Sequence, residues 1–131
     1  MPKPSCVLFS YGTLSRPPLR SPQEALALLN IRHHFKAVYG AKWMGDNCKP
    51  DPQAFFGVVK DIGADPQKTA MFEDSFKNLV TAKSLGMSTV FVQSETAREE
   101  GVAEPQLKAV DAVVDEVTEE QLRTHAPWLW P

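Results

Sequence analysis

The feature that most constrains the fold is a series of short apolar runs with helical segments between them. The runs lie at residues 6–11, 69–72, 89–92 and 111–114. The first has no polar alternation, which predicts a strand buried on both faces. Strands that alternate with helices at this spacing predict right-handed βαβ units. We therefore expect an α/β protein, a three-layer sandwich with a mostly parallel sheet.

Capping residues predict where the helices begin. Ser21 before a proline predicts a helix whose apolar face includes residues 28–29. Asp51 before another proline predicts the start of a second helix. The terminal helix is expected to begin with a capping box that Gln121 completes. Between the first two helices, residues 35–39 are a candidate for a further short strand.

Polar side chains that follow a strand are the first place to look for a site, because ligands of open parallel sheets bind beyond the carboxyl ends of the strands. After the third of these runs comes Gln93. After the second come Glu73 and Asp74, with Asn78 one helical turn later. Crowded oxygen ligands of this kind suit Mg²⁺. The alternative interpretation is that Asp74 or Ser75 only caps the helix that follows.

Two further residues indicate an anion site. Lys49 precedes a helix on a loop, where a lysine can hold an anion, although alone it has the character of a surface lysine. Ser10 ends the first predicted strand and is followed by Tyr11 and Gly12, and a hydroxyl with free backbone N–H groups can hold a phosphate oxygen. Neither G-x-S-x-G nor a P-loop motif occurs, so a catalytic triad or a P-loop enzyme is not supported.

The order of these motifs carries a resemblance to a known family. Ser10, then Lys49-Pro-Asp-Pro, then Glu73-Asp-Ser make the chain resemble the haloacid dehalogenase superfamily from about residue 6 to residue 117. Residues 72–87 are most similar to its pyrimidine 5′-nucleotidase-like branch. The resemblance implies one Rossmann-like core domain over residues 1–131 without a cap domain. It also implies a Mg²⁺-dependent hydrolase of phosphomonoesters, nucleotides among them.

The resemblance assigns roles to two groups of residues. It implies that Ser10 and Lys49 are catalytic and bind the phosphate, to which the turn after Ser10 would add the backbone of Tyr11 and Gly12. It implies that the second group binds Mg²⁺: Glu73, Asp74 and Asn78. In the family an aspartate attacks phosphorus and forms a phosphoaspartate that water then cleaves.

The attacking aspartate of the family is missing from this sequence. Its motif is Asp-x-Asp on the first, central strand, and no Asp-x-Asp precedes Lys49. Residues 9–14 echo the family's Asp-x-Tyr-Gly-Thr-Leu without the aspartate. If Ser10 instead belongs to the second motif, a strand is absent between the runs at 6–11 and 69–72. The sheet would then close up, exchange a strand with another copy, or use a longer N-terminal segment, and we expect such a segment in the gene product or its ancestor.

Composition excludes some partners. The net charge of −2 and the scattered lysines and arginines do not favour nucleic acid. No apolar run approaches the ~20 residues of a membrane span, and no secretory signal is seen, so we expect a cytoplasmic protein with a small phosphorylated partner. An unpaired sheet edge would favour a homo-oligomer. A non-catalytic anion-binding domain is the alternative, and a phosphoacceptor receiver domain is disfavoured because there the acidic residues precede the lysine.

Overall fold

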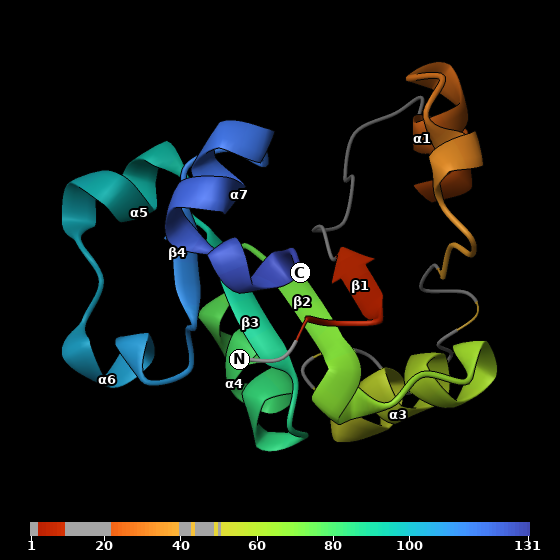
Figure 1. The fold of residues 1–131 in the computed structure, drawn as a ribbon, viewed down its shortest axis with the longest axis horizontal. Helices are drawn as coiled ribbons and strands as arrows, with labels where there is room; N and C mark the ends of the chain where they lie inside the picture. The colour runs from red at the N-terminus through yellow and green to blue at the C-terminus, as the bar shows by residue number, and fades with distance from the viewer. Residues whose placement is uncertain (1–2, 10–21, 40–42, 44–48, 50) are drawn as a thin grey trace.

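A four-stranded parallel sheet forms the centre of the protein. The computed structural model describes residues 3–9, 22–39, 43, 49 and 51–131 (Figure 1). Within these residues the strands follow the order β1-β2-β3-β4, with bounds Cys6–Phe9, Thr69–Glu73, Ser88–Val92 and Ala112–Val114. All neighbouring strands are parallel. The predicted α/β architecture is confirmed.

Helices cover both faces of this sheet. The helices and 3-10 turns of the described residues are α1 (Pro22–Leu28), η1 (Arg32–His34), α3 (Pro52–Ile62), η2 (Pro66–Lys68), α4 (Phe76–Ser84), α5 (Glu95–Glu100), α6 (Glu104–Leu107), α7 (Glu119–His125) and η3 (Pro127–Leu129). Met71 of β2 packs with Phe55 of α3 and Leu79 of α4 on one face. Phe72, the next residue of β2, belongs to the cluster that Leu122 of α7 contacts on the other face. This alternation produces the three layers.

Local capping explains why the central helices begin and end where they do. The Asp51 carboxylate accepts the backbone N–H of Gln53 at 2.9 Å, which caps α3 as predicted. Gly63 ends α3 in the left-handed conformation, with φ of 66°. Gly86 follows α4 with φ of 93°, and β3 begins two residues later. No helix of the described residues has the length and apolar character that a membrane crossing needs.

Strand β1 differs from the prediction of burial on both faces. Leu8 packs against the cluster that α3 and α4 cover, but the side chains of Val7 and Phe9 are 43% and 50% exposed. Phe9 still stacks on Phe72, with 4.7 Å between ring centroids. The reason is that β1 is an edge strand of the described sheet, and the described helices α7 and η3 cover its neighbours but not this face of β1.

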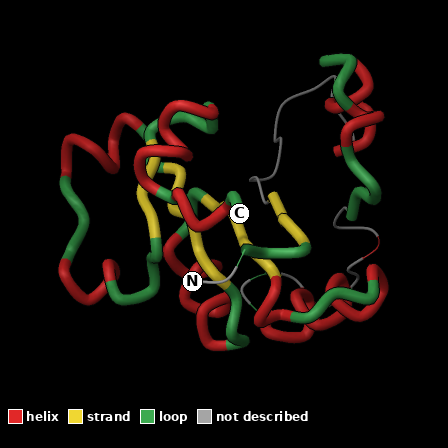
Figure 2. The backbone as a smooth tube through the Cα atoms, viewed as in Figure 1, coloured by secondary structure: helices red, strands yellow, loops and turns green. Residues whose placement is uncertain are grey.

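One other prediction near the N-terminus is wrong. Residues 35–39 are irregular rather than a strand, because Tyr39 donates a hydrogen bond to Asp61 and so is tied to α3 instead of a sheet edge. The helix predicted after Ser21 is present as α1, and Leu28 and Leu29 of its apolar residues are each 69% exposed. Figure 2 shows α1 set apart from the strands.

No gap separates β1 from β2. Cys6 pairs with Thr69, and Phe9 pairs with Phe72 in parallel register. If Ser10 belongs to the second motif, this direct pairing is what a closed-up sheet requires, and strand exchange with another copy stays a prediction. The longer N-terminal segment stays a prediction.

Candidate functional site

The site is built around Glu73, the last residue of β2. Its side chain is 1% exposed, and a buried carboxylate requires compensating partners. Its Oε1 accepts the backbone N–H groups of Asp74 at 3.0 Å and Ser75 at 3.2 Å. Its Oε2 accepts Asn78 Nδ2 at 2.9 Å and pairs with Lys49 Nζ at 3.4 Å. Four donors therefore converge on one buried carboxylate at the carboxyl end of the sheet.

Glu73 also performs the capping that sequence reasoning gave to its neighbours. The Ser75 side chain makes no capping hydrogen bond, although Ser75 is the residue that precedes α4. Glu73 Oε1 instead satisfies the N–H groups ahead of the helix. The capping predicted for Asp74 or Ser75 is therefore performed by the carboxylate of Glu73.

Lys49 reaches this site from a different part of the chain. It lies 24 residues before Glu73 in sequence, just ahead of α3, and its side chain is 23% exposed. The ion pair holds its ammonium group at the end of β2. The ammonium group of Lys49 is thus partly exposed to solvent beside the buried carboxylate.

Asp74 is the exposed carboxylate of the site. A hydrogen bond with the Glu73 carboxyl group raises the pKa of Asp74, partial burial raises it further, and Lys49 acts in the opposite direction. Two adjacent carboxyl groups that compete in this way favour either a shared proton or a cation.

These side chains offer Mg²⁺ few direct ligands. Mg²⁺ binds through one or two carboxylates and keeps several waters, which suits Asp74 as the direct ligand. Glu73 already accepts or pairs with four donors, and Asn78 donates its amide N–H to Glu73. Both residues would therefore support the site through these hydrogen bonds. In the part of the chain that the structure describes, no three His, Cys, Asp or Glu residues cluster as a metal site. A bound ion would therefore rely on water for most of its shell.

The structure brings together four of the seven residues predicted to bind phosphate or Mg²⁺: Lys49, Glu73, Asp74 and Asn78. The other three, Ser10, Tyr11 and Gly12, lie outside the described residues. Strand β1 ends at Phe9, which pairs with Phe72, the residue before Glu73. The carboxyl end of β1 and the Glu73 site are therefore at the same end of the sheet.

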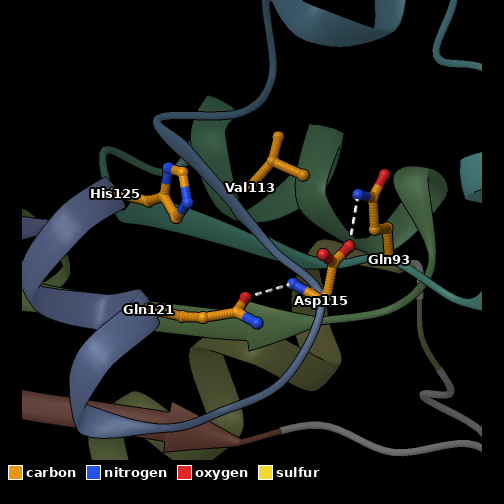
Figure 3. Close-up of a pocket in the computed structure, with 5 residues that line it drawn as sticks. All are labelled: Gln93, Val113, Asp115, Gln121 and His125. Carbon is orange, nitrogen blue, oxygen red and sulfur yellow. Dashed lines mark hydrogen bonds between the residues drawn. The ribbon is translucent and has the colours of Figure 1, made fainter.

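Sequence reasoning missed a pocket beside β3 and β4. Its volume is about 300 Å³, and its lining residues are Gln93, Val113, Asp115, Gln121 and His125 (Figure 3). Gln93 was noted because it follows a strand. The expected capping box does not form, because Gln121 Oε1 accepts the backbone N–H groups of Asp115 and Glu116 instead. No signal within α7 alone indicates this pocket, because its lining also includes Gln93, which lies 22 positions before Asp115.

The carboxylate of the pocket is held in its ionised form. Gln93 Nε2 donates to Asp115 Oδ1 at 2.6 Å, and Arg98 Nε donates to the same oxygen at 3.1 Å. The hydrogen bond from Gln93 is the main reason that the pKa of Asp115 is lowered, and Arg98 and His125 also lower it. Asp115 thus presents a negative charge next to a guanidinium group.

Comparisons with known proteins place this geometry in context. Residues 18–92 match the family described as haloacid dehalogenase-like hydrolase. Over 75 residues the chain is 32% identical to a phosphorylated carbohydrates phosphatase of Thermotoga maritima, and the match covers 56% of this chain and 34% of the relative. The chain thus spans about a third of the length of that curated relative.

Solved structures share the fold. A β-phosphoglucomutase from Clostridium difficile gives a TM-score of 0.56 at 24% identity, over 77% of this chain and 42% of that one. A haloacid dehalogenase-like protein of unknown function from Agrobacterium tumefaciens gives 0.59 at 23% identity, over 83% and 48%. A HAD family hydrolase from Deinococcus radiodurans with bound phosphate and sodium gives 0.58 at 16% identity, over 76% and 44%. At these identities the likeness concerns the fold alone.

Proposed function

Because the chain belongs to the haloacid dehalogenase-like hydrolase family, we propose that it carries a Mg²⁺-dependent phosphatase site for small phosphorylated molecules at the end of β2. The observation that carries this proposal is the placement of Lys49 Nζ 3.4 Å from the buried Glu73 carboxylate, beside the exposed Asp74. In this proposal Lys49 and Ser10 bind the phosphate, with the backbone of Tyr11 and Gly12.

The charges of the described residues explain why a metal would be required. One ammonium group, on Lys49, faces two carboxyl groups, on Glu73 and Asp74. When both carboxyl groups are ionised, the site has an excess of negative charge and repels a phosphate dianion. A divalent cation at Asp74 reverses the sign and, when bound, supplies the charge that draws in phosphoryl oxygens. Lys49 then provides the second positive contact.

Two observations each favour a different class of substrate. The curated relative is named as a phosphatase of phosphorylated carbohydrates, which supports sugar phosphates. Residues 72–87 resemble the pyrimidine 5′-nucleotidase-like branch, which supports nucleoside monophosphates. Both present the same phosphomonoester to the site, and they differ only in the group that leaves.

A second function, binding without turnover, is favoured by one feature of the sequence. No Asp-x-Asp precedes Lys49, so the carboxylate that attacks phosphorus in the family has no counterpart there. A chain that keeps the charges around Glu73 without that nucleophile binds a phosphorylated ligand and does not cleave it. This is the alternative that the experiment must separate from hydrolysis.

The experiment measures phosphate release from p-nitrophenyl phosphate, uridine monophosphate and glucose 6-phosphate, with and without Mg²⁺. Asp74→Asn is the test variant, and Glu99→Gln, an exposed carboxylate on α5, is the matched control. Mg²⁺-dependent release that Asp74→Asn abolishes and Glu99→Gln preserves supports the phosphatase. Mg²⁺-dependent binding without release supports the second function. If the chain neither binds nor hydrolyses these compounds, both proposed functions are wrong.

A further inference from the structure

The pocket beside β3, β4 and α7 shares no residue with the proposed phosphate site. It lies at the same end of the sheet, where parallel α/β proteins bind ligands. Gln93 follows β3 directly and Asp115 follows β4 directly, so parallel pairing of these strands brings the two side chains together (Figure 3). Its volume of about 300 Å³ is at the small end of the range for small-molecule sites.

A hydrogen-bond network fixes the walls of this pocket. Gln93 Nε2 and Arg98 both donate to Asp115 Oδ1, at 2.6 and 3.1 Å. The backbone N–H of Asp115 donates to Gln121 Oε1 at 2.7 Å. The network thus joins β3, β4, α5 and α7. Side chains held by such bonds need little further ordering when a ligand binds, which lowers the entropic cost of binding.

Several polar atoms of the lining have no hydrogen-bond partner among the described residues. They are Asp115 Oδ2, Gln93 Oε1, Gln121 Nε2 and the ring nitrogens of His125. Two of these atoms only accept hydrogen bonds, one only donates, and the imidazole does both. A ligand that satisfies them must both donate and accept, as hydroxyl groups do.

The charges and the apolar part of the lining further restrict the class of ligand that the pocket can bind. The Asp115 carboxylate repels anions, and the Arg98 guanidinium beside it repels cations and offsets the negative charge. Val113 adds an aliphatic surface that suits the C–H groups of a sugar. We propose that this pocket binds a neutral polyol, such as a monosaccharide, through adjacent hydroxyl groups that donate to Asp115 and accept from Gln121.

The test is a titration of the ¹⁵N-labelled chain, followed by amide NMR in Mg²⁺-free buffer. The probes are D-glucose and D-glucitol, with glucose 6-phosphate and n-butylamine as charged counterparts. We expect saturable shifts of the Gln93 and Gln121 side-chain NH₂ signals with the neutral probes and weaker binding of both charged probes. Because Mg²⁺ is absent and different residues report, the outcome is independent of the proposed phosphatase.

The variants identify the contacts. Asp115→Asn should weaken binding about tenfold, because hydrogen bonds to a charged acceptor are the strong ones. Glu99→Gln alters an exposed carboxylate on α5 outside the pocket and should leave affinity unchanged. His125→Ala, an exposed position, should weaken binding severalfold and serves as the test if Asp115→Asn does not fold. No saturable shift with either neutral probe, preference for a charged probe, or unchanged affinity in His125→Ala would overturn the proposal.

Discussion

Replacement of Glu73 by glutamine tests whether this buried carboxylate holds the end of the sheet together. The glutamine side chain keeps one oxygen for the N–H groups of Asp74 and Ser75, but its amide NH₂ group then faces Asn78 Nδ2 and Lys49 Nζ, which are themselves donors. An unsatisfied buried donor costs about 1–3 kcal/mol, and a lost hydrogen bond to a charged group about 1.5–3 kcal/mol. The lost interaction with the partly exposed Lys49 contributes at the lower end of this second range. We expect a loss of about 3 kcal/mol in the free energy of unfolding.

Urea unfolding at neutral pH measures this loss. The transition midpoint should fall while the m-value stays constant, and the melting temperature should fall by about 10 °C for a domain of this size. Glu99→Gln, at an exposed position on α5, should stay within about 0.5 kcal/mol of the wild type. A Glu73→Gln variant as stable as that control would refute the argument that four donors depend on this carboxylate.

Three further predictions concern other charged groups. The pKa of Asp74 is raised, chiefly by its hydrogen bond with the Glu73 carboxyl group, so the folded chain binds this proton more tightly. The stability gained from this proton is fully present below the ordinary pKa of 3.8 and is lost as pH rises through the raised pKa. In urea unfolding across acid pH, Asp74→Asn should not show this loss of stability. Burial and the bond to Asp61 raise the pKa of Tyr39 to about 12, so stability should be lost as pH rises from 10.0 to about 12, and Tyr39→Phe should lack this step in alkaline melts. Lys83→Met removes the 2.6 Å partner of Asp111 Oδ1 and should cost about 1 kcal/mol in urea unfolding, because this pair is partly exposed; an unchanged midpoint would contradict that role.

The central elements could be predicted because their signals are local. Asp51 and Gly63 bound α3 through hydrogen bonds and backbone conformations that each involve residues close in sequence. The uninterrupted apolar run of β2 needs no distant partner to be read as a buried strand, and all five of its residues are buried. The placement of acidic residues after that strand was sufficient to locate the candidate site.

What the sequence left open depends on contacts that lie outside each local pattern. Residues 35–39 have the composition of a strand, but Tyr39 binds Asp61 across 22 positions. Gln121 has the spacing of a capping box, yet the residues after β4 present two N–H groups that its side chain accepts. Sequence reasoning treated Asp74 as the main ligand with Glu73 beside it, and could not show that Glu73 is the buried one.

Binding of inorganic phosphate, followed by ³¹P NMR with and without Mg²⁺, tests the central claim most directly. The arrangement of Lys49, Glu73 and Asp74 predicts that phosphate binds only when Mg²⁺ is present and that Asp74→Asn abolishes this binding while Glu99→Gln does not. Phosphate binding that is equally tight without Mg²⁺, or that survives in Asp74→Asn, would contradict the account.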